Sequence, residues 1–137
     1  MYNNEEINKL LNSLNETKFR GSFHLNENMI NYCKEKGFLK IKSDAREIIE
    51  KRLSQAEPKN DGKQTPTRRN SHPVFIAQHA CGCCCRGCLE RIHHIKKGKE
   101  LSDKEINYIV NVLMIWIVRE VKRYSMVKNK KMNLIQK

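Results

Sequence analysis

The stretch SDKEINYIVNVLMIWIVREV, residues 102–121, decides the expected fold because it predicts a helix that is apolar on nearly every side. Ser102 and Glu105 have the spacing of a capping box, in which each side chain accepts a hydrogen bond from an amide of the first turn. A helix of this kind lies at the centre of a core or at a dimer contact, and we expect the core. Val112, Ile115 and Trp116 widen the face that is formed at helical spacing by Ile106, Ile109, Val110, Leu113, Ile117 and Val121.

Three further helices are expected before this one, each with an apolar face of its own. Residues 4–15 carry one apolar stripe, and residues 39–54 have aliphatic side chains on one face and charged ones on the other. Residues 27–36 follow Asn26, a favourable N-cap, and stop before Gly37, a favourable end. The fold class is therefore mainly α, and α+β at most.

The region before the cysteines predicts irregular structure. Residues 56–73, AEPKNDGKQTPTRRNSHP, contain all three prolines and mostly polar side chains, which favours a long connection. The short apolar run at 74–77 is interpreted as a strand, so one short strand or hairpin is allowed in the fold. We expect a single helical domain over residues 1–127, with a zinc-binding segment at 72–95 and a basic, flexible tail at 128–137.

Composition bounds the partners and the location. The chain has 137 residues and a net charge of +12, from 27 lysines and arginines against 15 aspartates and glutamates, which favours polyanionic partners such as nucleic acid. The first residues, MYNNEEINKLLNSLNE, lack the basic start and the continuous apolar run of a secretory signal. The most apolar stretch, residues 106–118, is interrupted by two asparagines and is shorter than the ~20 residues of a membrane span. We expect a soluble cytoplasmic protein with no membrane partner.

Residues 79–88, HACGCCCRGC, hold five of the six cysteines. Thiols stay reduced in the cytoplasm, where clustered cysteines indicate metal binding or catalysis rather than disulfides. Cys85 and Cys88 form a CxxC pair, a spacing that lets two thiolates from one turn reach the same tetrahedral ion. We predict structural zinc, with a helix that begins after Cys88. The expected ligands are His79, Cys85, Cys88 and His93, with Cys84 as the main substitute.

Other sulfur chemistry stays open. An iron–sulfur cluster needs about four thiolates, which Cys81, Cys83 or Cys84, Cys85 and Cys88 could supply at an unusually compressed spacing. Neighbouring cysteines bridge poorly, which disfavours a disulfide framework, and no βαβ pattern surrounds the CxxC pair as a thioredoxin-like dithiol requires. Cys33, inside the second helix, is expected to be a small buried side chain.

Six segments resemble an uncharacterised bacterial and phage family, domain of unknown function 4186. They are KFRGSFHL (18–25), AEPKNDGKQTP (56–66), HPVFIAQHA (72–80), CCRGCLE (84–90) and the short runs YIV (108–110) and WI (116–117). The resemblance spans residues 18–121 and implies no activity, because the family has none assigned. The family pattern has non-thiol residues at the positions of Cys81 and Cys83, which disfavours the iron–sulfur cluster. The resemblance thus implies that the candidate ligands are His79, Cys84, Cys85, Cys88 and His93.

Three functional hypotheses follow. In one, a metal-dependent hydrolase or nuclease keeps an open coordination position for water and uses Asp61 or Glu90 as the base. In another, a phage or host-defence factor uses the metal to stabilise a protein-binding surface. We favour a third, a zinc-stabilised binding module whose surface cations, with the basic tail, contact nucleic-acid phosphates. Its expected phosphate contacts are Arg68, Arg69, Arg86, Arg91, Lys96 and Lys97.

Overall fold

The computed structural model describes residues 1–59, 61, 65–67 and 71–136, and every regular element among them is helical. This confirms the mainly α fold class. The elements in chain order are α1 (Asn4–Asn15), the short 3-10 helix η1 (Arg20–Ser22), α2 (Glu27–Lys36), α3 (Phe38–Arg52), α4 (Pro73–Cys81), α5 (Arg86–His93) and α6 (Asp103–Gln136).

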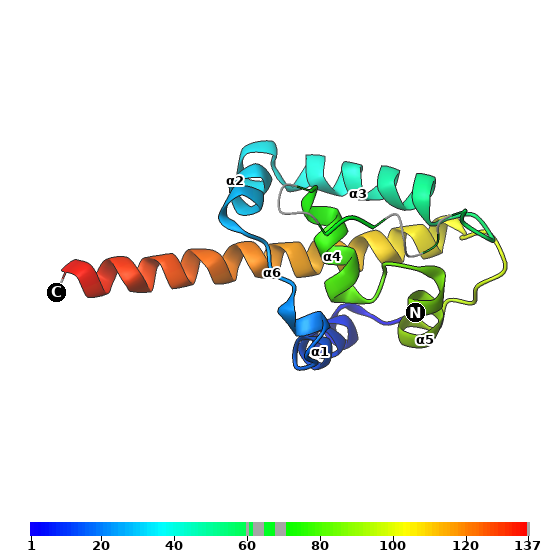
Figure 1. Ribbon diagram of the computed structural model, residues 1–137, viewed down its shortest axis with the longest axis horizontal. Coiled ribbons are helices and arrows are strands. Elements are labelled where there is room, and N and C mark those ends of the chain that lie inside the picture. The colour runs from blue at the N-terminus through cyan, green and yellow to red at the C-terminus, as the bar shows by residue number, and fades with distance from the viewer. Residues whose placement is uncertain (60, 62–64, 68–70, 137) are drawn as a thin grey trace.

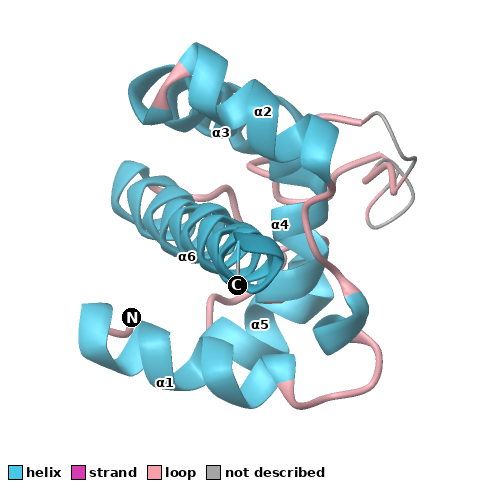
Figure 2. Cartoon of the chain, turned by 90° about the vertical axis from the view of Figure 1, so that its left-hand side faces the viewer, coloured by secondary structure: helices cyan, strands magenta, loops and turns pink. Residues whose placement is uncertain are grey.

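Helix α6 is the axis of the molecule. Figures 1 and 2 show α2 and α3 on one side of α6 and α1 on the other, with α4 beside it, and α6 packs most extensively against α3 and α4. The predicted capping box is present: the Ser102 amide donates to Glu105 Oε1 at 2.9 Å, and the Glu105 amide donates to Ser102 Oγ at 3.1 Å. Ile109, Leu113 and Ile117 are fully buried. The first half of α6 is therefore the central core helix, as its pattern predicted.

The N-terminal helices begin and end close to where the sequence predicts. Asn26 accepts from the Met29 amide at 2.9 Å, and Gly37 ends α2 with a φ of 84°, a backbone conformation that favours glycine. Cys33 is buried in α2, as expected. Helix α3 starts one residue earlier than predicted and ends at Arg52, before the predicted end at residue 54.

The expectation of a strand at residues 74–77 is wrong, because these residues lie in α4. His72 caps this helix, with Nδ1 accepting from the Val74 amide at 3.1 Å, and Pro73 occupies the first turn, where its fixed φ suits a helix. A short continuous apolar run occurs in buried helices and in buried strands alike. Here the features that indicate a helix are the His72 cap and Gly82, which ends α4 at a φ of 70°.

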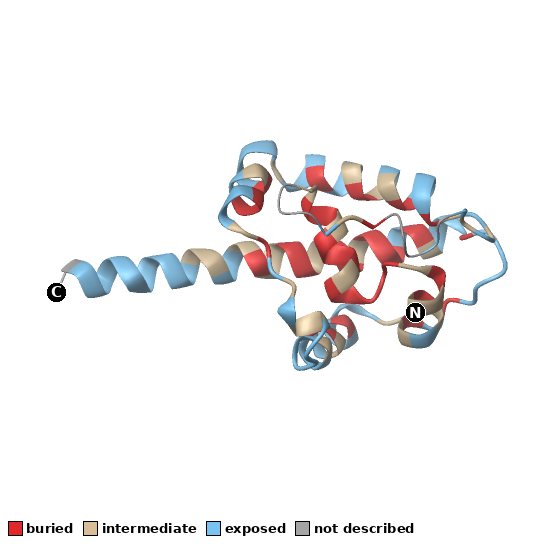
Figure 3. Ribbon diagram, viewed as in Figure 1, coloured by how far each residue is buried: buried red, intermediate tan, exposed pale blue. Residues whose placement is uncertain are grey.

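The C-terminal part of α6 extends away from the body. In Figure 3 this part is almost entirely exposed, whereas the first half of the helix is mostly buried. We call residues 122–136 the α6 arm. The sequence predicts a basic, flexible tail at residues 128–137, and in the structure α6 continues through Gln136. Among the described residues, no helix is both long enough and apolar enough to cross a membrane.

Candidate metal centre

A tight reversal between α4 and α5 builds the site. Gly82 leaves α4 in the left-handed conformation, and the Cys83 amide then donates to the Gln78 carbonyl at 2.8 Å. A Cβ on Gly82 would lie 2.5 Å from Cδ1 of Ile92, so the Ile92 side chain would have to move to accommodate a larger residue here. Cys85 caps α5, which begins at Arg86 rather than after Cys88 as expected. The cysteines of the CxxC pair therefore sit in the cap and first turn of a helix that folds back on α4.

The reversal gathers the sulfurs of Cys84, Cys85 and Cys88, all of which lie within 4.8 Å of one another. The Sγ atoms of Cys84 and Cys88 are 3.7 Å apart. Two sulfurs bound at ~2.3 Å to one tetrahedral Zn²⁺ lie about 3.8 Å apart, so this pair already has the required separation. The Cys88 amide also donates to Cys85 Sγ at 3.3 Å, a contact that favours a thiolate. Three of the predicted ligands are thus brought together.

Two guanidinium groups contact the sulfur of Cys88. Arg20 Nη2 lies 3.4 Å from Cys88 Sγ while Nη1 donates to the His79 carbonyl at 2.6 Å, and Arg91 approaches the same sulfur at 3.7 Å. A hydrogen bond from the Cys84 thiol, supported by Cys85 and Arg20 and opposed by desolvation, lowers the pKa of Cys88 to about 4. The same bond raises the pKa of Cys84, and burial raises the pKa of Cys85. This shift favours a thiolate at Cys88 in the protein without metal.

His79 presents a ring nitrogen suited to a metal. Its Nε2 lies 3.1 Å from the carbonyl oxygen of Thr65, which can only accept, so Nε2 carries the proton and Nδ1 carries a lone pair. Nδ1 is buried and has no hydrogen-bond partner among the described residues. Metal-binding histidines commonly donate their other ring N–H to a carbonyl in this way. The His79 ring stacks on Phe23, with 5.1 Å between the ring centroids.

Thr65 connects the histidine to the sulfurs. Besides accepting from His79, it donates through Oγ1 to the Cys84 carbonyl at 3.1 Å. His79 is not a member of the group whose ligand atoms all lie within 4.8 Å of one another. It therefore lies beside the cysteine group, linked to it by Thr65 and by Arg20.

His93 lies apart from this group, in the core. It is 1% exposed, and both ring nitrogens have partners: Nδ1 is 2.7 Å from the Tyr108 hydroxyl and Nε2 is 2.8 Å from the Cys81 carbonyl. Burial lowers the pKa of His93, which favours the neutral ring. Cys83 Sγ is 3.5 Å from Nε2 of His93 and, like Cys81, is fully buried. Within the described chain these two cysteines stay outside the group of three, so four sulfurs are not assembled.

The predicted phosphate contacts divide into three kinds. Arg86 is 1% exposed, and its guanidinium donates to the carbonyls of Leu53, Gln55, Lys96 and Lys99, so the expectation that it contacts phosphate is corrected by its burial. Arg91, Lys96 and Lys97 are exposed. Arg68 and Arg69 lie outside the described residues.

The carboxylates considered as catalytic bases are engaged with the backbone. Asp61 accepts from the Arg86 amide at 2.9 Å and so caps α5. Glu90 accepts from the Lys97 amide at 3.0 Å and holds the loop after α5.

Sequence analysis missed Arg20 and Thr65, which hold the site together. Arg20 is 59 residues from His79 and 68 from Cys88 along the chain, and no periodicity or spacing connects residues so far apart. The segment KFRGSFHL, which contains Arg20, was noted only for its resemblance to a family.

Comparison with known proteins agrees with this resemblance and adds no activity. No solved structure matches the chain. A family model, described as a domain of unknown function (DUF4186), matches residues 8–118, which include η1, α4 and α5 and therefore all the residues of the candidate centre. By this match over most of its length, the chain belongs to the DUF4186 family.

Proposed function

We propose that the protein is a zinc-binding module in which Cys84, Cys85, Cys88 and His79 hold one structural Zn²⁺. The observation that carries the proposal is the group of three sulfurs within 4.8 Å of one another, two of them already at the separation that a shared tetrahedral ion requires. His79 is chosen as fourth ligand over His93 because its buried Nδ1 has no partner in the described structure, whereas both nitrogens of His93 are engaged. Binding is expected to draw His79 toward the sulfurs.

The donor set favours zinc over an iron–sulfur cluster. Three cysteines and one histidine form a common structural zinc site, whereas an iron–sulfur cluster generally takes four cysteine ligands. Cys81 and Cys83 would have to leave the core to complete a set of four, because both are fully buried beside His93. Burial raises the pKa of both thiols, which opposes their use as thiolate ligands.

A structural role fits better than a hydrolytic one. Four protein ligands would leave no coordination position for a water nucleophile. Asp61 and Glu90 already accept backbone hydrogen bonds, which support α5 and the loop that follows it. The ion would instead join α4, α5 and, through Arg20, the η1 segment.

Metal analysis of the full chain, purified without chelators, tests this proposal. We expect about one zinc per chain, lost in Cys88→Ser and weakened in His79→Ala. Cys33→Ala and His94→Asn are matched controls, because Cys33 lies in α2 and His94 is an exposed left-handed residue that asparagine can replace. Full zinc content in Cys88→Ser would contradict the site. Spectra of the cobalt-substituted protein can report a nitrogen ligand. If that signal is lost in His93→Ala but kept in His79→Ala, the fourth ligand is His93 and not His79.

A second proposed role is association with nucleic acid through α5 and the loop that follows it. Arg91 in α5 and Lys96 and Lys97 in this loop are exposed, and the chain has a net charge of +12. Because each phosphate contact releases about 0.9 counterion on duplex DNA, binding should weaken steeply as salt increases. We expect the double variant Lys96→Glu, Lys97→Glu to lose retention of DNA or RNA at low salt while keeping its zinc. Unchanged retention would exclude this surface.

A further inference from the structure

A groove lies where the α6 arm leaves the body of the molecule. It has a volume of about 460 Å³ and is bounded by α1, by His24 in the segment before α2, and by α6. Small-molecule and peptide sites commonly have volumes of this order. Apolar side chains contribute to its lining, namely those of Leu11, Trp116, Met126 and Val127.

The rim of the groove is cationic. The acidic side chain in the lining, Glu120, is already engaged: it accepts from the Leu25 amide at 2.9 Å, contacts His24 at 3.1 Å and receives a bond from Arg123 at 3.4 Å. Its charge is therefore directed inward and largely compensated. The basic residues that line the groove are Arg119, Lys122, Arg123 and Lys130.

The arm residues that line the groove lie on one side of the helix, and Leu134 follows them on the same side. Arg123, Met126, Val127, Lys130 and Leu134 are spaced at i, i+3, i+4, i+7 and i+11, which places them on the same side of a helix. Met126 is 66% exposed and Leu134 is 73% exposed, although both are large apolar side chains. Apolar and cationic residues thus alternate along a helix face that has no partner within the described structure.

We propose that this groove and the adjoining side of the arm bind an acidic amphipathic helix of another protein. A helix laid along the groove would bury its apolar side against Met126, Val127 and Leu134, while glutamates or aspartates beside that stripe would meet the cationic rim. The distance along α6 from Trp116 to Leu134 corresponds to about 27 Å, or roughly five turns of partner helix. This proposal does not depend on the metal centre.

Charge and shape favour this occupant over two others. A second copy of the chain would place one basic arm against another, since residues 119–137 carry seven lysines and arginines and one glutamate. A nucleic acid could contact the rim, but its phosphates would not fill an apolar groove. Trp116 is 7% exposed, which leaves little ring surface for a base to stack on.

The single tryptophan of the chain lines the groove and gives a direct test. The probe is a synthetic helical peptide of about 20 residues with leucines at i, i+3, i+4 and i+7 and glutamates beside them. We expect saturable one-to-one binding to the full chain, measured by calorimetry, with a shift of Trp116 emission. A scrambled peptide of the same composition should bind at least about tenfold more weakly, because it keeps the charge but not the apolar stripe.

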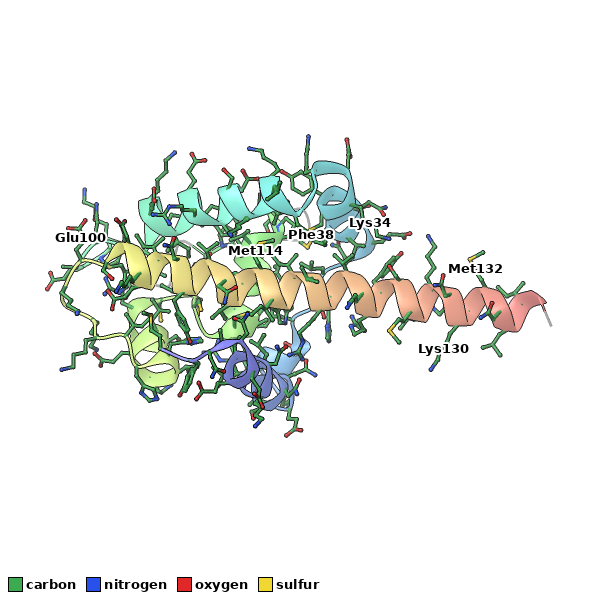
Figure 4. All side chains as sticks on the ribbon, turned by 180° about the vertical axis from the view of Figure 1, so that it is seen from behind. Lys34, Phe38, Glu100, Met114, Lys130 and Met132 are labelled. Carbon is green, nitrogen blue, oxygen red and sulfur yellow. The ribbon has the colours of Figure 1, made fainter. Side chains whose placement is uncertain are left out.

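Variants separate the groove from general charge attraction. Met126→Asp and Lys130→Glu should each weaken peptide binding about tenfold, because one removes apolar contact and the other reverses a rim charge. Met132→Asp and Lys104→Glu are the matched controls: Met132 points away from Lys130 on the same arm in Figure 4, and Lys104 is exposed at the other end of α6. Both controls should bind as the unaltered chain does.

Three results would overturn the proposal. The first is equal affinity for the designed and scrambled peptides, and the second is equal loss in Met126→Asp and Met132→Asp. The third is that duplex DNA shifts Trp116 emission, displaces the peptide, and binds Met126→Asp more weakly than the unaltered chain. The groove would then be assigned to nucleic acid.

Discussion

Two arginines hold the segment that carries the cysteine cluster in place from within the fold. Arg86 donates to four backbone carbonyls, at the end of α3 and in the loop between α5 and α6. Arg20 joins the His79 carbonyl to the Cys88 sulfur. A guanidinium has five donors in a rigid plane, which allows one side chain to satisfy several acceptors at once. Neither lysine nor an apolar residue has this geometry, so both positions should be sensitive to substitution.

Replacing Arg86 is expected to destabilise the protein. Arg86→Met would leave buried carbonyls without donors, and we expect a loss of about 3 kcal/mol in the free energy of unfolding, measured by urea denaturation. Lys97→Met, at an exposed lysine of the loop after α5, should change it by no more than about 0.5 kcal/mol. Equal stabilities for the two variants would show that the buried network contributes little.

The protonation of the three cysteines predicts how zinc binding depends on pH. The pKa of Cys88 is lowered to about 4, whereas the pKa values of Cys84 and Cys85 are raised, so near neutral pH only the latter two carry protons. Zinc binding should therefore release about two protons, and affinity should fall as the pH falls because both thiols must be deprotonated. Calorimetry in buffers of different ionisation enthalpy measures this number. Release of three protons would mean that Cys88 is a thiol in the metal-free protein.

At the scale of elements, the reversal between α4 and α5 determines where the cysteines lie. Gly82 has a φ of 70° and contacts the Ile92 side chain, so it is constrained both by its backbone and by its surroundings. Gly98 has a similar φ of 87° with no atom within 4 Å of an added Cβ. Both glycines therefore have a left-handed backbone, but only Gly82 has a neighbouring side chain that an added Cβ would meet.

This difference predicts unequal effects of alanine. Gly98→Ala should cost about 1 kcal/mol, from the left-handed backbone alone, whereas Gly82→Ala should cost about 2–3 kcal/mol because the side chain of Ile92 must also move. The double variant Gly82→Ala, Ile92→Ala should show a favourable coupling relative to the two single variants. Thermal unfolding, with and without added zinc, measures the loss of stability in each single variant and the coupling in the double variant. Additive losses in the double variant would indicate that the contact is unimportant.

At the scale of the whole molecule, the core and the arm are distinct. The first half of α6 is buried between α3 and α4, whereas most side chains of the arm, including Met126, Met132 and Ile135, are exposed (Figure 3). Apolar burial stabilises a fold only where the side chains leave water. The stability of the body should therefore depend little on the end of α6.

A truncation after Val127 tests this separation. We expect the free energy of unfolding to change by no more than about 0.5 kcal/mol, because residues 128–135 are exposed, and zinc content to stay the same. Helical content measured by circular dichroism should fall, and affinity for the acidic helical peptide should be lost with Lys130 and Leu134. By contrast, Leu113→Ala, in the fully buried part of the same helix, should cost about 3 kcal/mol. A large loss of stability on truncation would contradict this division.

The sequence by itself determined the helices with clear local patterns. The 3.6-residue periodicity and caps placed α1, α2 and the core of α6, because both patterns act within a few residues. The same sequence could not separate a buried helix from a strand at residues 74–77, where the apolar run is short and continuous. The CxxC spacing also acts within a few residues, so the sequence identified the cysteine cluster as a candidate metal site.

Only the tertiary structure decided how the remaining residues are used. It placed His93 and Cys83 in the core, brought Cys84 to 3.7 Å from Cys88, and linked His79 to the site through Thr65. It also buried Arg86, which the sequence analysis expected to contact phosphates. The physical reason is that hydrogen bonds and packing between segments tens of residues apart depend on how helices fold against one another, and no local pattern records this.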